Sequence, residues 1–586
     1  MKNKITRNLS ALILSFRMKS KIACLAILLV FSAEAKLFAG NPPDEGMWLP
    51  ILVERLNYVD MEKMGLHLTV QELYDINHSS LKDAIVGLSG GGAASGGFFC
   101  TAEVVSGEGL LFTNHHCGFN AVQNHSTPEH DYLTNGFWAM SKKEELSNEN
   151  LCASFLVRME NVTDSIIPFL SDSLKESARS EKIKELTAKM KKRASENEKY
   201  EVSIKAFYGG SEYYLFVFQT YKDIRLVGAP PSSIGKFGGD TDNWMWPRHT
   251  CDFTVFRIYA DSTGNPSAYS EKNVPLKPKY YLPISLKGVK KNDFAMIWGY
   301  PASTSRYLTS YGMEFNVNTF FPTLIKIFGK ELEVMKERMD VDKKVKIDYA
   351  GSYAGIANTW KNFIGQSKML VKNKVEDKKK ALEAEFINWY SKSPVLQQKY
   401  GTVLDNIKNG YSKLNTIAIP FFYANIAGMG LDAVQFAGQF GSLKSALEKK
   451  NKAGIKESVE GLKTTTKEHF KDIDPAVSKK TMAELLKIYT QNVPKDQLPS
   501  VFVLIEKDYH NDFNAFADAV FKTSVFVTEA NTMAFLNKPG MKVFKKDLVS
   551  IMAQSFQDAT GKYAAAYGEA RASISAGNRH FIAGLR

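Results

Sequence analysis

Cysteine is scarce in this chain, with five among 586 residues. No C-x-x-C or H-E-x-x-H spacing occurs, so a metal site built from His115, His116 and His125 or His130 has no motif behind it. We therefore expect no metal and no cofactor. The glycine-rich stretch 90–97 lacks the Lys-Ser/Thr ending of a phosphate loop, so nucleotide binding has no support. The chain also has no internal repeat and no low-complexity tract.

Negative charge is in deficit, and the net charge is +13. Residues 1–35 hold six basic residues and one acidic residue, so the net charge falls to +8 without them. The remaining lysines are spread along charged, helix-like segments. We read this charge as favouring solubility, and we expect no nucleic-acid partner.

The N-terminus has the pattern of a secretory signal peptide. Basic residues precede an apolar run, 22–33, which is followed by the A-x-A cleavage signature Ala33–Ala35. The run is too short for a stable transmembrane helix, and no later segment has the pattern of one. We predict a signal peptide over residues 1–35 and a mature protein that is periplasmic, secreted or on the cell surface.

The hydrophobic period changes once along the chain. From about Phe98 to Tyr300 it is mostly strand-like, with turn residues between the runs FFCTAEVV, GLLFT, SFLVRME, EVSIKAFY, YYLFVFQTY, FTVFRIYA and NDFAMIWGY. One charged helical insertion, Ser173 to Lys199, is predicted to open with a capping box from Ser173 to Glu176. From about Phe315 the pattern is helical, as in Lys368 to Tyr390, Leu443 to Lys463 and Ser478 to Gln491. The order predicts an α+β protein, with a β domain before a helical domain.

The most informative segment is FCTAEVVSGEGLLFTNHHCGF, from Phe99 to Phe119. Two short apolar runs flank a glycine-containing turn, a cysteine lies near each end, and the second run leads into His115 and His116. The arrangement resembles chymotrypsin-like serine peptidases, in which the catalytic histidine directly precedes a cysteine. Histidine suits a general base because it takes and returns a proton near neutral pH. The resemblance implies a disulfide between Cys100 and Cys117 that holds the loop of the histidine.

A second segment, Gly238 to Ala260, places Asp252 at the entrance of an alternating apolar strand. It resembles the segment that supplies the triad aspartate in chymotrypsin-like enzymes, where the carboxylate accepts a hydrogen bond from the imidazole and fixes its tautomer. A turn cap is the alternative for an aspartate at a strand start. Asp240 and Asp242 are nearby competitors, but they lie in a Gly/Asn loop.

Longer motifs make a resemblance to the bacterial dipeptidyl-peptidase 7 and 11 family. The chain contains DEGMWLP, TNHHCGF, GGDTDNWMWPRH, NDFAMIWGYPASTSRYLTS and GIANTWKNFIG. The resemblance implies a chymotrypsin-type double barrel with a large helical domain. It places the N-terminal part of the catalytic barrel at 36–312 and a helical domain that caps the cleft at 313–586, with the second barrel incomplete.

By position, this resemblance makes His116 the catalytic histidine and Asp252 its partner. Asn243, Trp244 and Asn358 match the residues that bind the free amino terminus of the substrate. Their chemistry suits that task, because an ammonium group needs acceptors such as amide carbonyls, and an indole face attracts a cation. The expected partners are peptides with a free N-terminus, and the family resemblance also implies a homodimer.

Two cysteines of the mature chain, Cys152 and Cys251, remain outside that pairing. Each lies beside a strand-like run. In an oxidising compartment they could form a second disulfide, and the alternative is two inert buried thiols.

The family nucleophile follows the helical domain in a Gly-Asn-Ser-Gly-Ser-Pro type loop, and no such loop occurs in this sequence. Ser89, in Gly87–Gly91, precedes His116 and is a superficial match, because its glycines better suit a flexible turn. We therefore expect a chain truncated before its catalytic serine and inactive as it stands. The primary hypothesis is a serine dipeptidyl-peptidase that lacks this segment. The alternative is a non-catalytic protein that binds peptide N-termini.

Overall fold

The computed structural model describes residues 48–171 and 174–586. The chain divides into two compact units, residues 1–63 and residues 64–586. In the described part of the first unit, the helices are η1 (Pro50–Leu52), α2 (Val53–Leu56) and α3 (Tyr58–Lys63). The predicted signal peptide, 1–35, lies outside the described residues, as does the start of the DEGMWLP motif.

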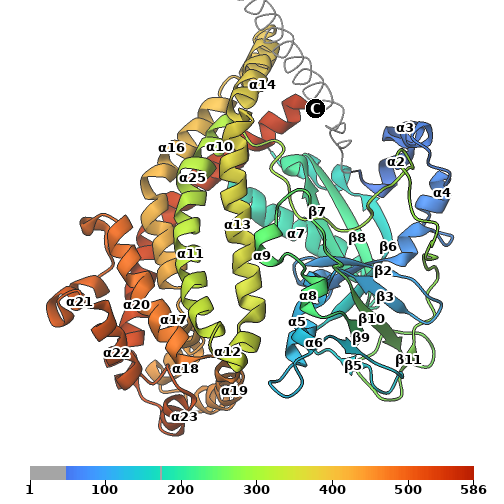
Figure 1. Cartoon of the computed structure of the whole chain (residues 1–586). Helices are drawn as coiled ribbons and strands as arrows, with labels where there is room; N and C mark the ends of the chain where they lie inside the picture. The colour runs from blue at the N-terminus through green and yellow to red at the C-terminus, as the bar shows by residue number, and fades with distance from the viewer. Residues whose placement is uncertain (1–47, 172–173) are drawn as a thin grey trace, which may run out of the picture. The chain divides into compact units, whose positions relative to one another are not determined.

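The second unit begins with one antiparallel sheet (Figure 1). Its strands are β1 (Ile85–Ser89), β2 (Cys100–Val104), β3 (Leu110–Thr113), β4 (Phe137–Trp138), β5 (Leu146–Ser147), β6 (Cys152–Asn161), β7 (Glu201–Phe207), β8 (Glu212–Tyr221), β9 (Asp223–Ala229), β10 (Thr254–Ala260) and β11 (Val274–Pro275). The order is β4-β9-β10-β3-β2-β1-β6-β8-β7, while β11 pairs with β10 and β5 pairs with β9.

The sheet encloses an apolar core. Alternate residues of its strands point inward, including Val86, Val104, Leu111, Leu226 and Phe256, and all five are almost fully buried. Strands β9 and β10 also contact β6 and β8 across this core, so the sheet curls as a barrel requires. The end strands β4 and β7 do not pair with each other within the described residues.

Two strand predictions need correction. The run NDFAMIWGY, 292–300, alternates between half-buried and exposed residues but forms no strand, because no described strand pairs with its backbone. In the opposite direction, Gly87 and Ser89 belong to the buried strand β1 rather than to a flexible turn. β1 pairs with both β2 and β6, which places it in the middle of the sheet.

Short helices connect the strands, and one long helix is inserted between β6 and β7. They are α4 (Val70–Leu73), α5 (His115–Asn124), α6 (Tyr132–Asn135), α7 (Glu176–Ala194), α8 (Ser232–Gly235) and α9 (Gly239–Asp242). Helix α7 is the predicted insertion. It begins at Glu176, and its N-cap Lys175 makes no side-chain capping bond. Ser173, the predicted cap, lies outside the described residues.

From Ser310 onward all assigned elements of the described chain are helical. The helices are α10 (Ser310–Phe315), α11 (Phe321–Met339), α12 (Lys343–Asp348), α13 (Ala350–Lys372), α14 (Val375–Tyr390), α15 (Pro394–Tyr400), α16 (Val403–Phe422), α17 (Asp432–Gly438), α18 (Gly441–Glu448), α19 (Lys452–Lys471), α20 (Pro475–Asn492), α21 (Val501–Tyr509), α22 (Phe513–Thr523), α23 (Glu529–Asn537), α24 (Met541–Lys546) and α25 (Leu548–Leu585). Two π-helical turns, η7 (Asn316–Phe320) and η8 (Tyr423–Gly428), adjoin α11 and α16.

Helix α25 packs along α16, and α11 lies beside α13 (Figure 1). Two of the predicted helices are broken. Lys374, with φ of 49°, separates α13 from α14. Lys450, with φ of 53°, separates α18 from α19, whose first turn is capped by Asn451. The third, Ser478 to Gln491, lies within α20, as predicted.

Among the described residues, no single helix is long and apolar enough to cross a membrane. The segments Pro394–Gly428 and Asp432–Gly438 meet that test only as a pair, and they are bent by 84° at the break.

Candidate functional site

The register of two strands brings His116 and Asp252 together. Strands β3 and β10 are antiparallel, with Thr113 opposite Thr254. His116 follows the end of β3 by three residues, and Asp252 precedes the start of β10 by two. Because paired ends of antiparallel strands share one edge of the sheet, both residues leave the sheet at the same place.

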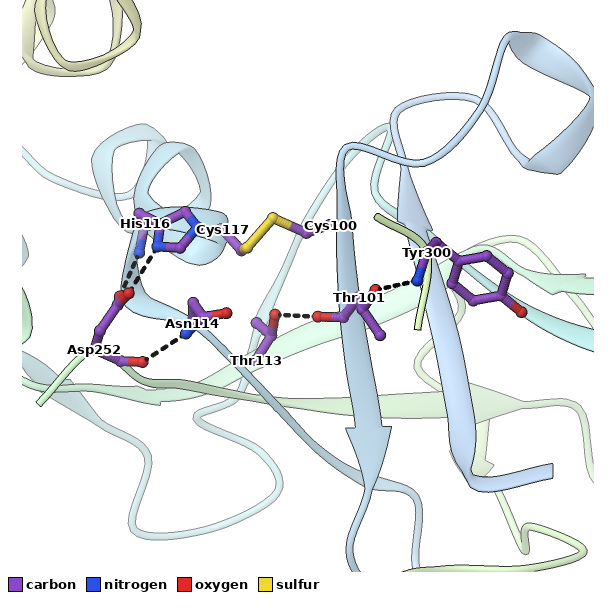
Figure 2. Close-up of a disulfide and its surroundings, with 8 residues drawn as sticks. All are labelled: Cys100, Thr101, Thr113, Asn114, His116, Cys117, Asp252 and Tyr300. Atoms are coloured by element: carbon purple, nitrogen blue, oxygen red, sulfur yellow. Dashed lines mark hydrogen bonds and ion pairs between the residues drawn. A yellow bond between two sulfur atoms is a disulfide. The ribbon is translucent and has the colours of Figure 1, made fainter. Parts of the chain in front are cut away.

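The contact between them is two-pronged (Figure 2). His116 Nδ1 lies 2.7 Å from Asp252 Oδ2, and the His116 backbone N–H donates to Oδ1 at 3.0 Å. Asn114 Nδ2 donates to the Asp252 carbonyl at 3.2 Å, which also fixes the backbone. The His116 side chain is 69% exposed, whereas that of Asp252 is 19% exposed. The imidazole is thus held on one side and open on the other.

The electrostatics favour an ionised Asp252. Burial acts to raise its pKa, but the hydrogen bonds from the His116 side chain and backbone, with the charge of the imidazole, outweigh it and leave the pKa below its ordinary value. An ionised carboxylate only accepts hydrogen bonds, so His116 Nδ1 carries the proton in this pair. In a neutral imidazole with this tautomer, the outer nitrogen, Nε2, is the acceptor.

His115 is oriented differently from its neighbour. Its side chain is 1% exposed, and burial lowers its pKa. It packs edge-on against Phe119 and so closely against Gly235 that a β-carbon there would overlap its ring. His115 therefore packs in the interior, and His116 is the histidine that faces Asp252.

A disulfide joins Cys100 and Cys117, as predicted (Figure 2). It ties the first turn of α5 to the start of β2, with Cα atoms 6.0 Å apart. Cys100, Cys117 and His116 also lie within 4.8 Å of one another through potential ligand atoms. Because both sulfur atoms are in the disulfide, this group supplies no thiolate for a metal.

Cys152 and Cys251 are free, so the possible second disulfide is not formed. Cys152 is buried in β6, and burial raises the pKa of its thiol. Cys251 is exposed, directly before Asp252. The alternative of two free thiols holds, but only one of them is buried.

A second cluster unites the loop after α9 with helix α13. Asn358 Oδ1 accepts from Asn243 Nδ2 at 2.9 Å and from Trp244 Nε1 at 3.0 Å. Trp244 Nε1 also lies 3.1 Å from the Asn358 carbonyl oxygen. The three residues assigned to the peptide N-terminus are 114 or 115 positions apart across these bonds and meet in one place.

The amides in this cluster are already partly engaged. Asn358 Oδ1 accepts two hydrogen bonds, and Asn243 Oδ1 accepts one from Arg248 at 3.2 Å. A carbonyl oxygen has two lone pairs, so an incoming ammonium must share or displace these partners. Trp244 has φ of 58°, a left-handed conformation that is uncommon for a bulky residue. Such a conformation is kept where the surrounding contacts determine it.

Several contributing residues carry no signal in the sequence. Arg248 orients Asn243, and Lys361, on α13, donates to the carbonyls of Asp240 and Thr241 at the end of α9. The side chain of Asp240 pairs with Lys236. Asp240, one of the two alternatives to Asp252 as the partner of the histidine, is therefore paired with a lysine instead. The Lys361 contacts span about 120 positions, which a local pattern does not encode, whereas the other two contacts join residues four or five positions apart.

Within the described residues, no hydroxyl group hydrogen-bonds to His116 Nε2. Ser89 is 1% exposed, and its hydroxyl accepts from the Gly92 N–H in the centre of the sheet. Ser89 is thus buried in β1 and makes no hydrogen bond to His116, so it is not placed to act as the nucleophile of this pair. The arrangement thus brings an imidazole together with an orienting carboxylate, and it contains a separate amide cluster.

The peptidase S46 family model matches residues 43–586. Dipeptidyl-peptidase 7 of Capnocytophaga gingivalis is 38% identical over 576 residues, which are 95% of this chain and 77% of that protein. The Asp/Glu-specific dipeptidyl-peptidase of the same organism is 40% identical over 498 residues, 84% of this chain and 67% of that protein. Relatives of both kinds thus match at similar identity.

The fold has a counterpart among solved structures. A crystal structure of Porphyromonas endodontalis DPP11 in complex with the dipeptide Arg-Glu superposes with a TM-score of 0.82 at 31% identity. The superposition covers 93% of this chain and 77% of that chain. A structure of the same protein in an alternate conformation gives a TM-score of 0.67.

Proposed function

The chain belongs to the peptidase S46 family, and from this premise we propose that it is built for serine-type dipeptidyl-peptidase chemistry. In this proposal His116 and Asp252 form the general-base pair. Asn243, Trp244 and Asn358 bind the free amino terminus of a peptide. The observation that carries the assignment is the bond of 2.7 Å between His116 Nδ1 and Asp252 Oδ2 beside an exposed outer nitrogen.

The geometry suits proton transfer. Nδ1–H donates to Asp252, so Nε2 takes a proton from a hydroxyl nucleophile as that hydroxyl attacks the peptide carbonyl. The ionised Asp252 stabilises the resulting imidazolium. The same nitrogen then returns the proton to the leaving amine, and a water repeats the cycle on the acyl intermediate.

The amide cluster supports selection for a free N-terminus. An ammonium group is a donor only, and it suits the carbonyl oxygens of Asn243 and Asn358. Trp244 is 56% exposed, so its ring face is accessible to a cation. Acetylation of the peptide removes the charge and blocks this interaction.

The test separates binding from turnover. The chain is titrated with Arg-Glu, the dipeptide bound in the DPP11 structure, and with its N-acetylated form. We expect binding of the free dipeptide only, and we expect Asn358→Ala to weaken it by roughly tenfold or more, as loss of a charge-assisted contact implies. Asn362→Ala, one turn further along α13, is the matched control. Equal binding of the acetylated dipeptide contradicts the assignment.

Turnover is measured on the chain and on a chimera that joins it to the part of C. gingivalis dipeptidyl-peptidase 7 that lies outside the matched region. We expect hydrolysis of dipeptidyl substrates by the chimera and none by the chain. A chain that hydrolyses these substrates places a nucleophile among its own residues. A chimera that folds and binds but does not hydrolyse rejects the catalytic role of His116 and Asp252.

The second candidate function is binding of peptide N-termini without catalysis. It is favoured by the lack, among the described side chains, of a hydroxyl group bonded to His116 Nε2. A chain that binds free dipeptides tightly and is inactive in every chimera supports this function instead.

We propose export to the periplasm or the cell surface. The basic residues, the apolar run 22–33 and the A-x-A signature support it, and so does the disulfide, which persists in oxidising compartments. Fractionation of the producing cells tests it, with N-terminal sequencing to find the cleavage site.

We also propose a homodimer, which rests on the family resemblance alone. Light scattering after size exclusion tests it, and a mass near 65 kDa instead of twice that value contradicts it.

A further inference from the structure

Helix α5 carries two side chains that face different parts of the molecule. His116 lies in its first turn and Gln123 in its last. The Gln123 side chain is half-buried. Its Nε2 donates to the Asp348 carbonyl at 2.8 Å, and its Oε1 accepts from the Gly351 N–H at 2.9 Å.

Those two backbone groups lie at a helix junction. Asp348 ends α12, and Gly351 is the second residue of α13. Carbonyls at a helix end and N–H groups at a helix start lack partners within their own helices. One amide side chain satisfies one group of each kind, which fixes both its orientation and the position of the junction.

Gly351 permits this approach. A β-carbon at that position would lie 2.5 Å from Gln123 Oε1 and 2.6 Å from Asn120 Oδ1. A β-carbon there would therefore displace both side-chain amides, which disturbs the Gln123 contact from the side of α13.

The junction is equidistant, in residues, from the two halves of the site. His116 precedes Gln123 by seven residues on α5, and Asn358 follows Gly351 by seven residues on α13. At 1.5 Å per residue, each arm is about 10 Å long. With arms of fixed length, the angle between the helices at the Gln123 contact sets the separation between the imidazole and the Asn358 amide.

We propose that Gln123 is a positioning residue that sets how many peptide residues fit between the amino-terminus cluster and His116. The inference rests on the proposed function and deepens it, because a peptidase that releases dipeptides must measure two residues. Two extended residues span about 7 Å, and one residue more or less changes that span by about 3.5 Å. A small change in the angle between α5 and α13 is therefore enough to change the selected length.

The test uses three ligands that differ by one residue: arginine, Arg-Glu and Arg-Glu-Gly. The amino terminus of each ligand is expected to bind at the amino-terminus cluster. The number of residues in the ligand then sets how far its terminal carboxylate reaches toward the His116 ring. The chain is labelled with ¹³C at its histidine rings, and the His116 resonance is assigned by its loss in His116→Ala. In the unaltered chain we expect Arg-Glu to shift the His116 resonance most, because only its carboxylate lies beside the ring.

Gln123→Ala and Gly351→Ala disturb the contact from its two sides. For both we expect the three ligands still to bind and the preference of the His116 shift for Arg-Glu to be lost. Gln123→Glu keeps the oxygen that accepts from Gly351 and loses the donor to Asp348, so it should keep part of the preference. Gln554→Ala, a helical glutamine on α25, is the control and should behave as the unaltered chain.

The outcomes distinguish a failure of the proposed function from a failure of the role assigned to Gln123. If the unaltered chain binds no free dipeptide, or binds acetylated Arg-Glu equally well, the proposed function fails and this inference fails with it. If it binds with the expected selectivity and the folded Gln123→Ala and Gly351→Ala variants keep the preference for Arg-Glu, the function stands and the role of Gln123 is wrong. If Gln123→Ala does not fold, Gly351→Ala and Gln123→Glu decide by the same measurement.

Discussion

His116 and Asp252 meet through the register of β3 and β10, and the disulfide holds the residue next to His116 to β2, whereas Asn243, Trp244 and Asn358 meet through the packing of α13. The first pair is fixed by contacts within the sheet region. The second cluster depends on the placement of α13. Both contacts join distant residues, 136 positions apart for His116 with Asp252 and 115 for Asn243 with Asn358, but the first follows from strand register and the second from the packing of a helix.

Some buried acids are compensated by a cation and others are not. In the sheet region, Asp223 pairs with Arg225 at 2.8 Å and Glu145 with Arg257 at 2.9 Å, whereas burial raises the pKa of Glu103 in β2. In the helical region, burial and the nearby Asp432 raise the pKa of Glu331 to about 7. Paired acids hold their charge, and an acid without such compensation takes up a proton.

The largest effect is expected from substitution of His116. In the chimera, His116→Ala should lower kcat for dipeptidyl substrates by about 10³-fold or more, because the general base is lost. His115→Ala should lower stability through a buried cavity while leaving more activity. Enzyme assays and thermal unfolding separate the two effects. An inactive His115→Ala beside an active His116→Ala shows that the register of the motif was misassigned.

The next effect concerns the disulfide. Replacing both Cys100 and Cys117 by serine should lower the free energy of unfolding by about 3 kcal/mol, as expected for a closed loop of this length. Chemical denaturation measures it, and Cys251→Ser is the control with an exposed free thiol. Binding of Arg-Glu to the folded double variant should change little, since the amino-terminus cluster does not include α5. If the folded double variant also loses binding of Arg-Glu, the disulfide positions the amino-terminus cluster as well as His116, which contradicts this comparison.

The third effect is a pH dependence in the helical region. The pKa of Glu331 is raised from 4.5 to about 7, so the folded state holds a proton that the unfolded state releases. Its contribution to stability is complete below about pH 4.5 and is lost as the pH rises through 7. Glu331→Gln should therefore raise Tm at pH 8 and change it little at pH 5, and Glu385→Gln, an exposed control, should do neither. An equal change in Tm at pH 5 and pH 8 would mean that ionisation of Glu331 is not the cause.

The smallest effect compares the two free thiols. Cys251 is exposed and should react with iodoacetamide in the folded protein. Cys152 is buried, and because burial raises its thiol pKa it should react only after unfolding. Peptide mapping by mass spectrometry measures both. Rapid alkylation of Cys152 in the folded state means that β6 opens readily.

Much of the sheet, and the pair His116 and Asp252, could be predicted from sequence patterns and motifs. Alternation identified β6, β8 and β10, and the His-Cys motif with its flanking strands identified His116. The segment 292–300 alternates equally well and forms no strand. Alternation reports which residues face a core, whereas a strand also needs a neighbour for its backbone.

The remaining features leave no signal in the local pattern of the sequence. The breaks at Lys374 and Lys450 are single left-handed residues inside continuous helical patterns, which periodicity does not register. The pairing of Asn243 with Asn358 spans 115 positions, and that of Gln123 with Gly351 spans 228. Motif resemblance supplied Asn243 and Asn358. Gln123 lies in none of these motifs, and only its hydrogen bonds to Asp348 and Gly351 indicate a role.

The last helix has a consequence for the order of folding during synthesis. Helix α25 contacts the turn between β7 and β8. Arg586, which follows α25, pairs with Glu212 at the start of β8 at 2.6 Å and stacks on Tyr208 in the turn, and Arg579 pairs with Glu176 at the start of α7 at 2.7 Å. The pair Glu212 and Arg586 is separated by 374 positions. At about 5–20 residues per second, the ribosome supplies the second partner roughly 20–75 s after the first. The β7–β8 hairpin thus emerges long before the helix that contacts its turn.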